Sequence, residues 1–131
     1  MTVFESSVSI PQPIEKVYAF LSDLNNHQQL MPENIYNWSS TADEAKFTIQ
    51  NMAKLALKVS ARVENAEILI EPSEEPPFAL SMKWLVVTDV SGTTAKLVVS
   101  AELNMMMKML AAGPLQKLVD HQTASLAKAF A

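Results

Sequence analysis

Cysteine is absent from this chain, and glycine and histidine each occur only twice. Without cysteine, disulfides, thiolate metal sites and a cysteine nucleophile are all excluded. The two glycines, Gly92 and Gly113, are too few for a glycine-rich phosphate loop. No spacing of His, Asp and Glu supplies the three or four ligands that a metal site needs. The sequence therefore predicts neither a metal nor another cofactor.

Basic residues are also scarce. The net charge is −4 and no run of Lys or Arg occurs, which argues against a nucleic-acid binder. The first ten residues have no basic start and no unbroken apolar stretch, so we expect no signal peptide. No window approaches the roughly 18 apolar residues of a membrane span. We therefore expect a cytoplasmic protein without an integral membrane span.

Apolar residues are abundant enough to build a core. They make up 49% of a chain of 131 residues, far more than a disordered chain contains. This length fits one domain, which we assign to residues 1–131. A domain of this size buries roughly two thirds of the surface that its unfolded chain exposes, so it needs no cross-links to be stable.

The period of the hydropathy pattern indicates the order of elements. Residues 2–10 alternate as a strand does, residues 13–24 carry apolar residues at helical spacing, and residues 26–30 can form a second short helical turn. Each later strand has one apolar and one polar face, which is typical of an antiparallel sheet. The first of these strands is predicted around Tyr36 and Trp38, which would share a face, and the second around Phe47 and Ile49. The other four are predicted over 55–64, 66–71, 78–88 and 94–103.

One of these strands has the clearest alternation in the chain. Over residues 55–64 it places its apolar side chains on one face and Lys58, Ser60, Arg62 and Glu64 on the other. The expected apolar face consists of Leu55, Leu57, Val59, Ala61 and Val63.

The last part of the chain is predicted to be helical. Asn104 is a plausible cap, and residues 105–112 form the first turns. Gly113-Pro114 is expected to kink or restart the helix, because proline lacks a donor and clashes with the preceding turn. One apolar stripe then continues to the end, formed by Leu115, Leu118, Val119, Gln122, Leu126 and Phe130.

Three segments carry a family resemblance that spans nearly the whole chain: Phe4 to Ile10, Pro13 to Asp23, and Leu103 to Phe130. In this order of elements, the chain resembles the START/Bet v 1-like superfamily (SRPBCC), which includes START lipid-transfer domains, Bet v 1 allergens and polyketide cyclase/dehydratase-like proteins. The resemblance implies an α+β helix-grip fold. A seven-stranded curved antiparallel sheet would surround a long C-terminal helix, with two short helices between strands 1 and 2. It also implies a cavity between sheet and helix that is open to hydrophobic ligands.

The apolar strand faces and the last helix would form the wall of such a cavity. Alternate connections of an up-and-down sheet lie at the same end, so the methionines near residues 31, 52 and 105–109 should surround its mouth. Methionine suits surfaces that adapt to varied apolar partners, although these residues could equally plug the core or contact a second subunit. The predicted ligand-binding residues are Trp38, Phe47, Ile49, Met52, Phe78, Met82, Trp84, Met106, Met109, Leu118 and Gln122.

Few residues are candidates for chemistry, and we assign none as catalytic. His27 is expected to be solvated, and His121 to be solvated or structural. Gln122 interrupts the apolar stripe of the last helix and should therefore face the sheet. A buried amide needs partners, so Gln122 either orients the polar end of a ligand or bonds to a strand residue.

Three functions remain open at this point. The first is a module that binds or carries a small hydrophobic molecule, such as a lipid, an isoprenoid or an aromatic metabolite. The second is an enzyme resembling polyketide cyclases or dehydratases, with Gln122, Tyr36 and His121 as candidate residues. The third is a protein-interaction module, for instance a homodimer formed through the methionines. The shortage of acid–base residues favours binding over catalysis.

Overall fold

The computed structural model describes residues 2–50, 53–76 and 78–130. It contains seven strands, two α-helices and one 3₁₀-helix, η1. Their order is β1 (Thr2–Ile10), α1 (Ile14–Ser22), η1 (Leu24–Leu30), β2 (Ile35–Ser40), β3 (Glu44–Ile49), β4 (Ala53–Val63), β5 (Glu67–Pro72), β6 (Leu80–Asp89), β7 (Gly92–Ala101) and α2 (Met105–Ala129).

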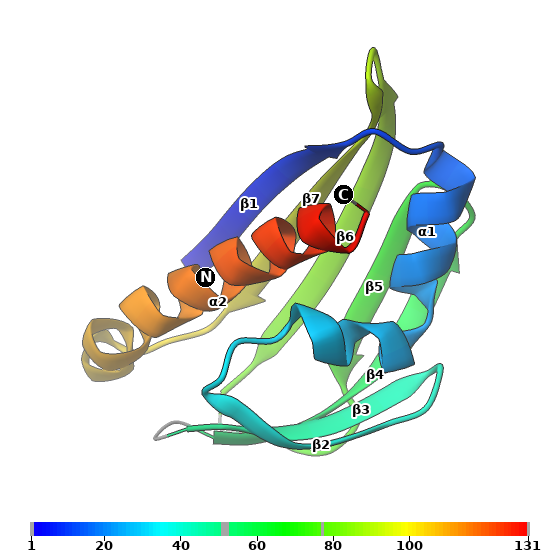
Figure 1. The fold of residues 1–131 in the computed structure, drawn as a ribbon. Coiled ribbons are helices and arrows are strands. Elements are labelled where there is room, and N and C mark those ends of the chain that lie inside the picture. Colours follow the sequence, from blue (N-terminus) through cyan, green and yellow to red (C-terminus); the bar gives the residue numbers. More distant parts are fainter. Residues whose placement is uncertain (1, 51–52, 77, 131) are drawn as a thin grey trace.

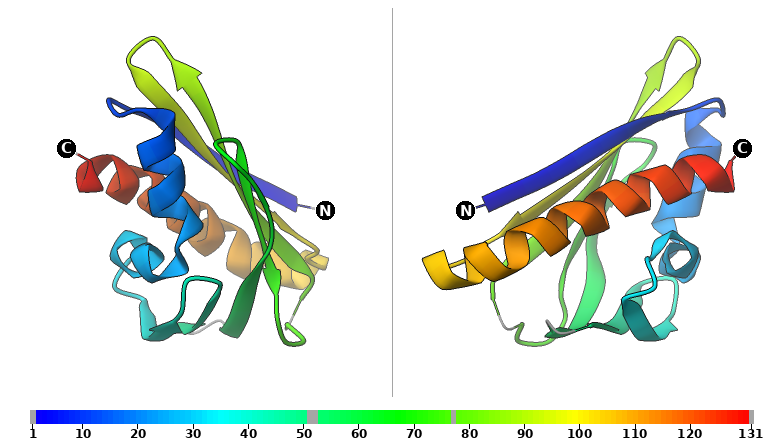
Figure 2. Two further views of the ribbon diagram at one scale, coloured as in Figure 1. Left: turned by 90° about the vertical axis from the view of Figure 1, so that its right-hand side faces the viewer. Right: turned by 60° about the vertical axis from the view of Figure 1, so that its left-hand side comes forward.

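The strands form one antiparallel sheet in the order β1-β7-β6-β5-β4-β3-β2. The sheet curves strongly, and α2 crosses its concave side beside β1 (Figure 1). Helices α1 and η1 lie over the same side, where α1 packs against β5–β7 and η1 packs against β2 and β3 (Figure 2). The predicted α+β helix-grip fold is therefore confirmed, including the two short helices between the first two strands.

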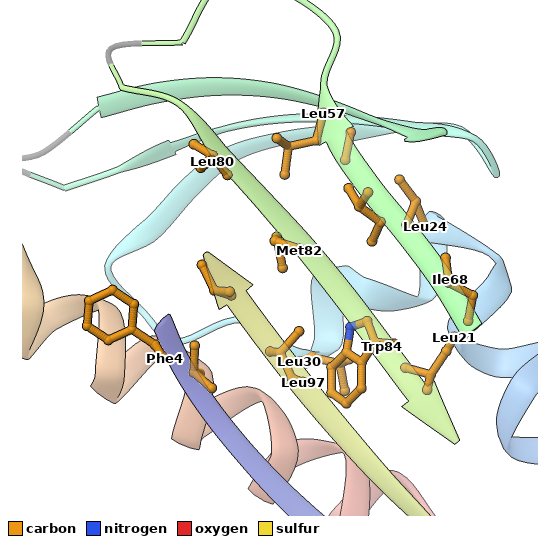
Figure 3. Packing of buried hydrophobic residues seen from close by; sticks show 14 of the residues in the cluster. Phe4, Leu21, Leu24, Leu30, Leu57, Ile68, Leu80, Met82, Trp84 and Leu97 are labelled. Carbon is orange, nitrogen blue, oxygen red and sulfur yellow. The ribbon is translucent and has the colours of Figure 1, made fainter. Parts of the chain in front are cut away.

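The core lies on the concave face because the apolar residues of the strands alternate with polar ones. Leu80, Met82, Trp84 and Val86 of β6 are all buried. Figure 3 shows how Leu80, Met82 and Trp84 follow one another along β6 toward Leu97 of the neighbouring strand. The alternation of the sequence thus decides which face the helices must cover.

Helix α2 is fixed to the edge strand β1 by polar as well as apolar contacts. Its side chains Leu115, Val119 and Leu126 are buried against the sheet. The hydroxyl groups of Thr123 and Ser6 are 2.7 Å apart, and Gln116 Nε2 donates to the carbonyl oxygen of Glu5 at 3.3 Å. These bonds set the position of α2 across the concave face.

The predicted restart at Gly113-Pro114 is wrong, because α2 continues unbroken from Met105 to Ala129. A residue that precedes proline normally avoids the helical conformation because its Cβ clashes with the proline ring. Gly113 has no Cβ and faces open space, so this clash does not arise. Leu110, four residues before Pro114, is exposed. Proline lacks the N–H group that would bond the carbonyl oxygen of Leu110 in a regular helix.

A β-bulge in β2 overturns the predicted common face of Tyr36 and Trp38. The register shifts between Tyr36 and Ser39, and Asn37 adopts a left-handed conformation with φ of 55°. The extra residue reverses the alternation. Tyr36 pairs with Thr48 and is exposed, whereas the half-buried Trp38 ring stacks on Phe47 with 5.2 Å between ring centroids.

A second bulge reverses the far end of β4. Val59 pairs with Ile70, but Ala61 pairs with Leu69, so Ser60 is an extra residue. Residues 55–59 follow the predicted alternation, whereas Ala61 and Val63 are exposed rather than facing the core. Arg62 pairs with the buried Ile68 and turns to the concave side, where α1 lies.

Candidate functional site

A cavity lies between the concave face of the sheet, helix α2 and the short helix η1. Its volume is about 40 Å³. Almost all of its lining is apolar, and it draws on β2–β7 as well as both helical segments. The lining residues are Leu24, His27, Met31, Trp38, Ala45, Phe47, Ile49, Leu55, Leu57, Ile70, Phe78, Leu80, Met82, Val99, Ala101, Leu115, Leu118, Val119 and Gln122.

The volume of the cavity sets its possible contents. A single water needs roughly 10–15 Å³ of such space, so the cavity is larger than one water. An apolar cavity that admits benzene is roughly 150 Å³. Binding of any organic ligand therefore requires side chains of the cavity wall to move. Among these side chains, Met31 and Met82 are unbranched and flexible.

Most of the predicted site residues lie in this wall, although their role in binding stays a prediction. Trp84 is fully buried but does not line the cavity, Met106 and Met109 are exposed on α2, and Met52 lies outside the described residues. The predicted residues that do line the cavity are Trp38, Phe47, Ile49, Phe78, Met82, Leu118 and Gln122.

The indole of Trp38 has a defined orientation at one side of the cavity. Its Nε1 donates to Ser40 Oγ at 2.9 Å, and Ser40 Oγ donates to Asn25 Oδ1 at 2.8 Å. The ring also stacks on Phe47, with planes inclined by 14°. Because its N–H already has a partner, Trp38 presents an apolar ring to the cavity.

Gln122 brings an amide group into this apolar surrounding. The residue is fully buried, and its Oε1 and Nε2 have no hydrogen-bond partner within the described part of the chain. Of the two alternatives predicted from the sequence, a bond to a strand residue is thus not found. Such unpaired buried groups are rare in folded proteins and destabilise them, so they call for an explanation.

His27 is a lining residue that the sequence analysis did not identify, since we expected it to be solvated. It is only 2% exposed, and its Nε2 lies 2.8 Å from the carbonyl oxygen of Leu21. Because a carbonyl oxygen can only accept, Nε2 carries the proton. Burial lowers the pKa of His27, although the bond to Leu21 and the charge of Asp23 oppose this shift.

The spacing of residues in η1 contains the signal that would have placed His27. Leu24, His27 and Leu30 are three residues apart, and a 3₁₀-helix has three residues per turn. All three are therefore on one face, and all three are buried. The ring of His27 also meets that of Trp84 edge-on, with 6.4 Å between centroids.

The other candidates for chemistry lie away from the cavity. Tyr36 and His121 are both exposed and do not line it. Among the described residues, no three His, Asp or Glu side chains gather closely enough to hold a metal ion. Of the three residues considered for an enzyme, only Gln122 belongs to the wall.

The described methionines divide into two groups. Met31 and Met82 line the cavity, and Met107 packs against the core. Met105, Met106 and Met109 are exposed, with residue accessibilities of 72–83%, and Leu110 is also exposed, at 72%. We call these four residues the exposed α2 face. It lies on the first turns of the helix, which extend past the end of the sheet (Figure 2).

Solved structures share this fold at low sequence identity. The KanY protein has a TM-score of 0.82 at 14% identity, with 98% of this chain and 97% of that chain covered. XoxI from Bacillus cereus has a TM-score of 0.78 at 12% identity, covering 99% and 96%. The Aha1 dimer from Colwellia psychrerythraea has a TM-score of 0.68 at 16% identity, covering 99% and 96%.

Sequence comparisons identify no further similar protein. No protein-family model matches the chain, and a search of curated proteins finds no match either.

In the described residues, none of the helices has the length and apolar character required to cross a membrane. At identities of 12–16%, the likeness to solved structures shows the helix-grip fold alone.

Proposed function

We propose that this chain is a START/Bet v 1-like protein that binds a small hydrophobic molecule in the cavity between the sheet and α2. The observation that carries this proposal is the apolar cavity itself. Cores of natural proteins are close-packed, and voids larger than a water are few. An apolar void is unfavourable for water but favourable for an apolar ligand. Likeness to the helix-grip fold supports the same conclusion.

The volume narrows the choice of ligand. At about 40 Å³, the cavity is far smaller than a lipid or an isoprenoid. A compact aromatic or aliphatic molecule requires the smallest displacement of the wall. We therefore place compact hydrophobic metabolites before lipids and isoprenoids among the predicted ligands.

Filling the cavity tests this proposal. Ala45 lines the cavity on β3, so Ala45→Leu extends a larger side chain into it. Ala61→Leu is the matched control, because Ala61 is exposed on β4. Toluene titrated into the wild type in a calorimeter should bind saturably at one site. Ala45→Leu should abolish this binding with an unchanged circular dichroism spectrum, and Ala61→Leu should retain it.

Two results would contradict the proposal. Binding that survives Ala45→Leu would place the ligand elsewhere, and the absence of saturable binding by the wild type would remove the function. Native mass spectrometry of protein expressed without added ligand provides an independent check. A co-purifying small mass that disappears in Ala45→Leu, but not in Ala61→Leu, would support the cavity.

Self-association is a second candidate function, favoured by the exposed α2 face. Four large apolar side chains on one helical segment form the kind of patch that often mediates contacts. One structural neighbour is described as a dimer. If two copies associate there, Met106→Ser with Met109→Ser should lower the mass measured by light scattering at high concentration. The control pair Val87→Ser with Val90→Ser changes exposed residues near the β6–β7 hairpin and should not.

Catalysis like that of polyketide cyclases has less support. Two of its three candidate residues, Tyr36 and His121, are exposed outside the cavity. An activity that survives truncation of the side chains of Tyr36, His121 and Gln122 would exclude this version of an enzyme.

The cytoplasmic location expected from the sequence stays a prediction.

A further inference from the structure

Gln122 lines the cavity, and its amide group is buried without a hydrogen-bond partner. Among the described residues, the buried side-chain polar atoms without a partner are Nε1 of Trp84 and both polar atoms of Gln122. Only Gln122 of these two residues lines the cavity. Its Nε2 can donate and its Oε1 can accept, so a group that does both could pair with the whole amide.

The rest of the wall indicates the charge of such a group. None of the described lining residues is an Asp, Glu, Lys or Arg. The ion pairs involve side chains at the surface, such as Lys83 with Glu67 and Lys96 with Glu5. A carboxylate or phosphate in this cavity would therefore be buried without a counter-charge, which is strongly unfavourable.

His27 does not supply the missing charge. It is the ionisable residue in the described wall, and its Nε2 already donates to the carbonyl oxygen of Leu21. Burial lowers the pKa of His27, so the neutral form is favoured near neutral pH. A neutral imidazole cannot balance an anion.

We propose that the ligand is a compact neutral molecule with an apolar body and one hydroxyl or primary amide group, and that this group pairs with Gln122. The inference rests on the proposed function and specifies its ligand. A hydroxyl would donate to Oε1 and accept from Nε2 of Gln122. The apolar body would contact aliphatic and aromatic neighbours such as Leu118, Phe47 and Met82. Anionic fatty acids and phospholipids are excluded as ligands.

Three molecules of similar shape test this proposal. Para-cresol carries a neutral hydroxyl at pH 7, para-xylene has a methyl group in its place, and para-toluate has a carboxylate. Each is titrated by calorimetry into the wild type, into Gln122→Leu and into Gln29→Leu. Gln122→Leu keeps a side chain of similar size without polar atoms. Gln29→Leu is the control, since Gln29 is exposed on η1.

We expect the wild type and Gln29→Leu to bind para-cresol about three- to tenfold more tightly than para-xylene, the range of one net hydrogen bond. Para-toluate should bind most weakly. Gln122→Leu should bind para-xylene at least as tightly as para-cresol. The side-chain amide resonances of Gln122 should shift with para-cresol and not with para-xylene.

The outcomes separate this inference from the function on which it rests. If para-xylene binds the wild type as tightly as para-cresol, or if the preference survives Gln122→Leu, the pairing with Gln122 is wrong and apolar binding stands. If para-toluate binds most tightly, the neutral character of the site is wrong. If none of the three binds the wild type, both the inference and the proposed function are overturned.

Discussion

Nε2 of His27 donates a hydrogen bond of 2.8 Å to the carbonyl oxygen of Leu21, and both residues are buried. Burial lowers the pKa of His27 below its ordinary value near 6.5. As the pH falls, His27 therefore becomes protonated in the unfolded chain before it does so in the folded protein. The contribution of the neutral His27 to the free energy of unfolding is complete above about pH 6.5 and is lost as the pH falls toward the pKa of His27 in the folded protein.

Acidification should consequently destabilise the protein through His27. Between pH 7.5 and 5.5, the free energy of unfolding in urea should fall by up to about 1.4 kcal/mol per pH unit from this residue. His27→Gln should flatten the decline. His121→Gln should leave it unchanged, because His121 is exposed. An identical pH dependence in His27→Gln and the wild type would show that His27 is not the group responsible.

Removing the amide of Gln122 should stabilise the fold. Both of its polar atoms are buried without a partner, and leucine has a similar size without that penalty. We expect Gln122→Leu to raise the free energy of unfolding by about 1–2 kcal/mol, measured in urea. A loss of stability instead would mean that the amide has partners in the resting protein. Gln29→Leu at the surface should change the value by less than about 0.5 kcal/mol.

Gly92 cannot accept a side chain. Its φ is +148°, and a Cβ there would lie 2.7 Å from the backbone nitrogen of Gln12 and in close contact with the carbonyl oxygen of Ile10. Gly92→Ala should therefore lower the free energy of unfolding by about 1–3 kcal/mol. Gly113→Ala is the contrasting change, because a Cβ there meets no atom within 4 Å other than those of its chain neighbours and of its own helix backbone. Gly113→Ala should cost less stability than Gly92→Ala, because its new Cβ meets only the adjacent Pro114 ring, and an equal loss in both variants would refute the steric argument at Gly92.

Arg62 holds the end of α1 against the β2–β3 turn. Its Nε donates to Ser22 Oγ, and its Nη2 donates to the Ser22 carbonyl oxygen and to Asp43 Oδ1, each at 2.8 Å. Arg62→Ala should cost about 1–2 kcal/mol of stability and speed hydrogen exchange in α1. Lys58→Ala, on the exposed side of the same strand, should do neither. Unchanged exchange in α1 would show that Arg62 does not anchor the helix.

Hydrophobic periodicity was sufficient to predict the sheet and most of the wall residues, although Trp84 of β6 does not line the cavity and Gly113-Pro114 does not interrupt the last helix. It failed where one extra residue reverses the alternation. The bulge at Ser60 turns Arg62 toward α1, and that at Asn37 separates Tyr36 from Trp38. A bulge is decided by tertiary contacts on both sides of a strand, so a single sequence carries little trace of it.

The site shows the same division between local and tertiary information. Gln122 was predicted to face the sheet from its place in an apolar stripe, and it does. His27 was expected to be solvated because its sequence neighbours are polar. It is buried because the 3₁₀-helix η1 has a period of three, which places His27 on the same face as Leu24 and Leu30. The volume of the cavity depends on how side chains from six strands meet two helical segments. No local pattern encodes that volume.

The sheet is open, and each of its two edge strands carries a feature that would hinder pairing with a foreign strand. At β2, the bulge at Asn37 interrupts the straight row of backbone groups that another chain would need. At β1, Gln116 of α2 occupies the carbonyl oxygen of Glu5. If the core opens to admit a ligand, as we propose, these two features would limit aggregation through the edges of the sheet.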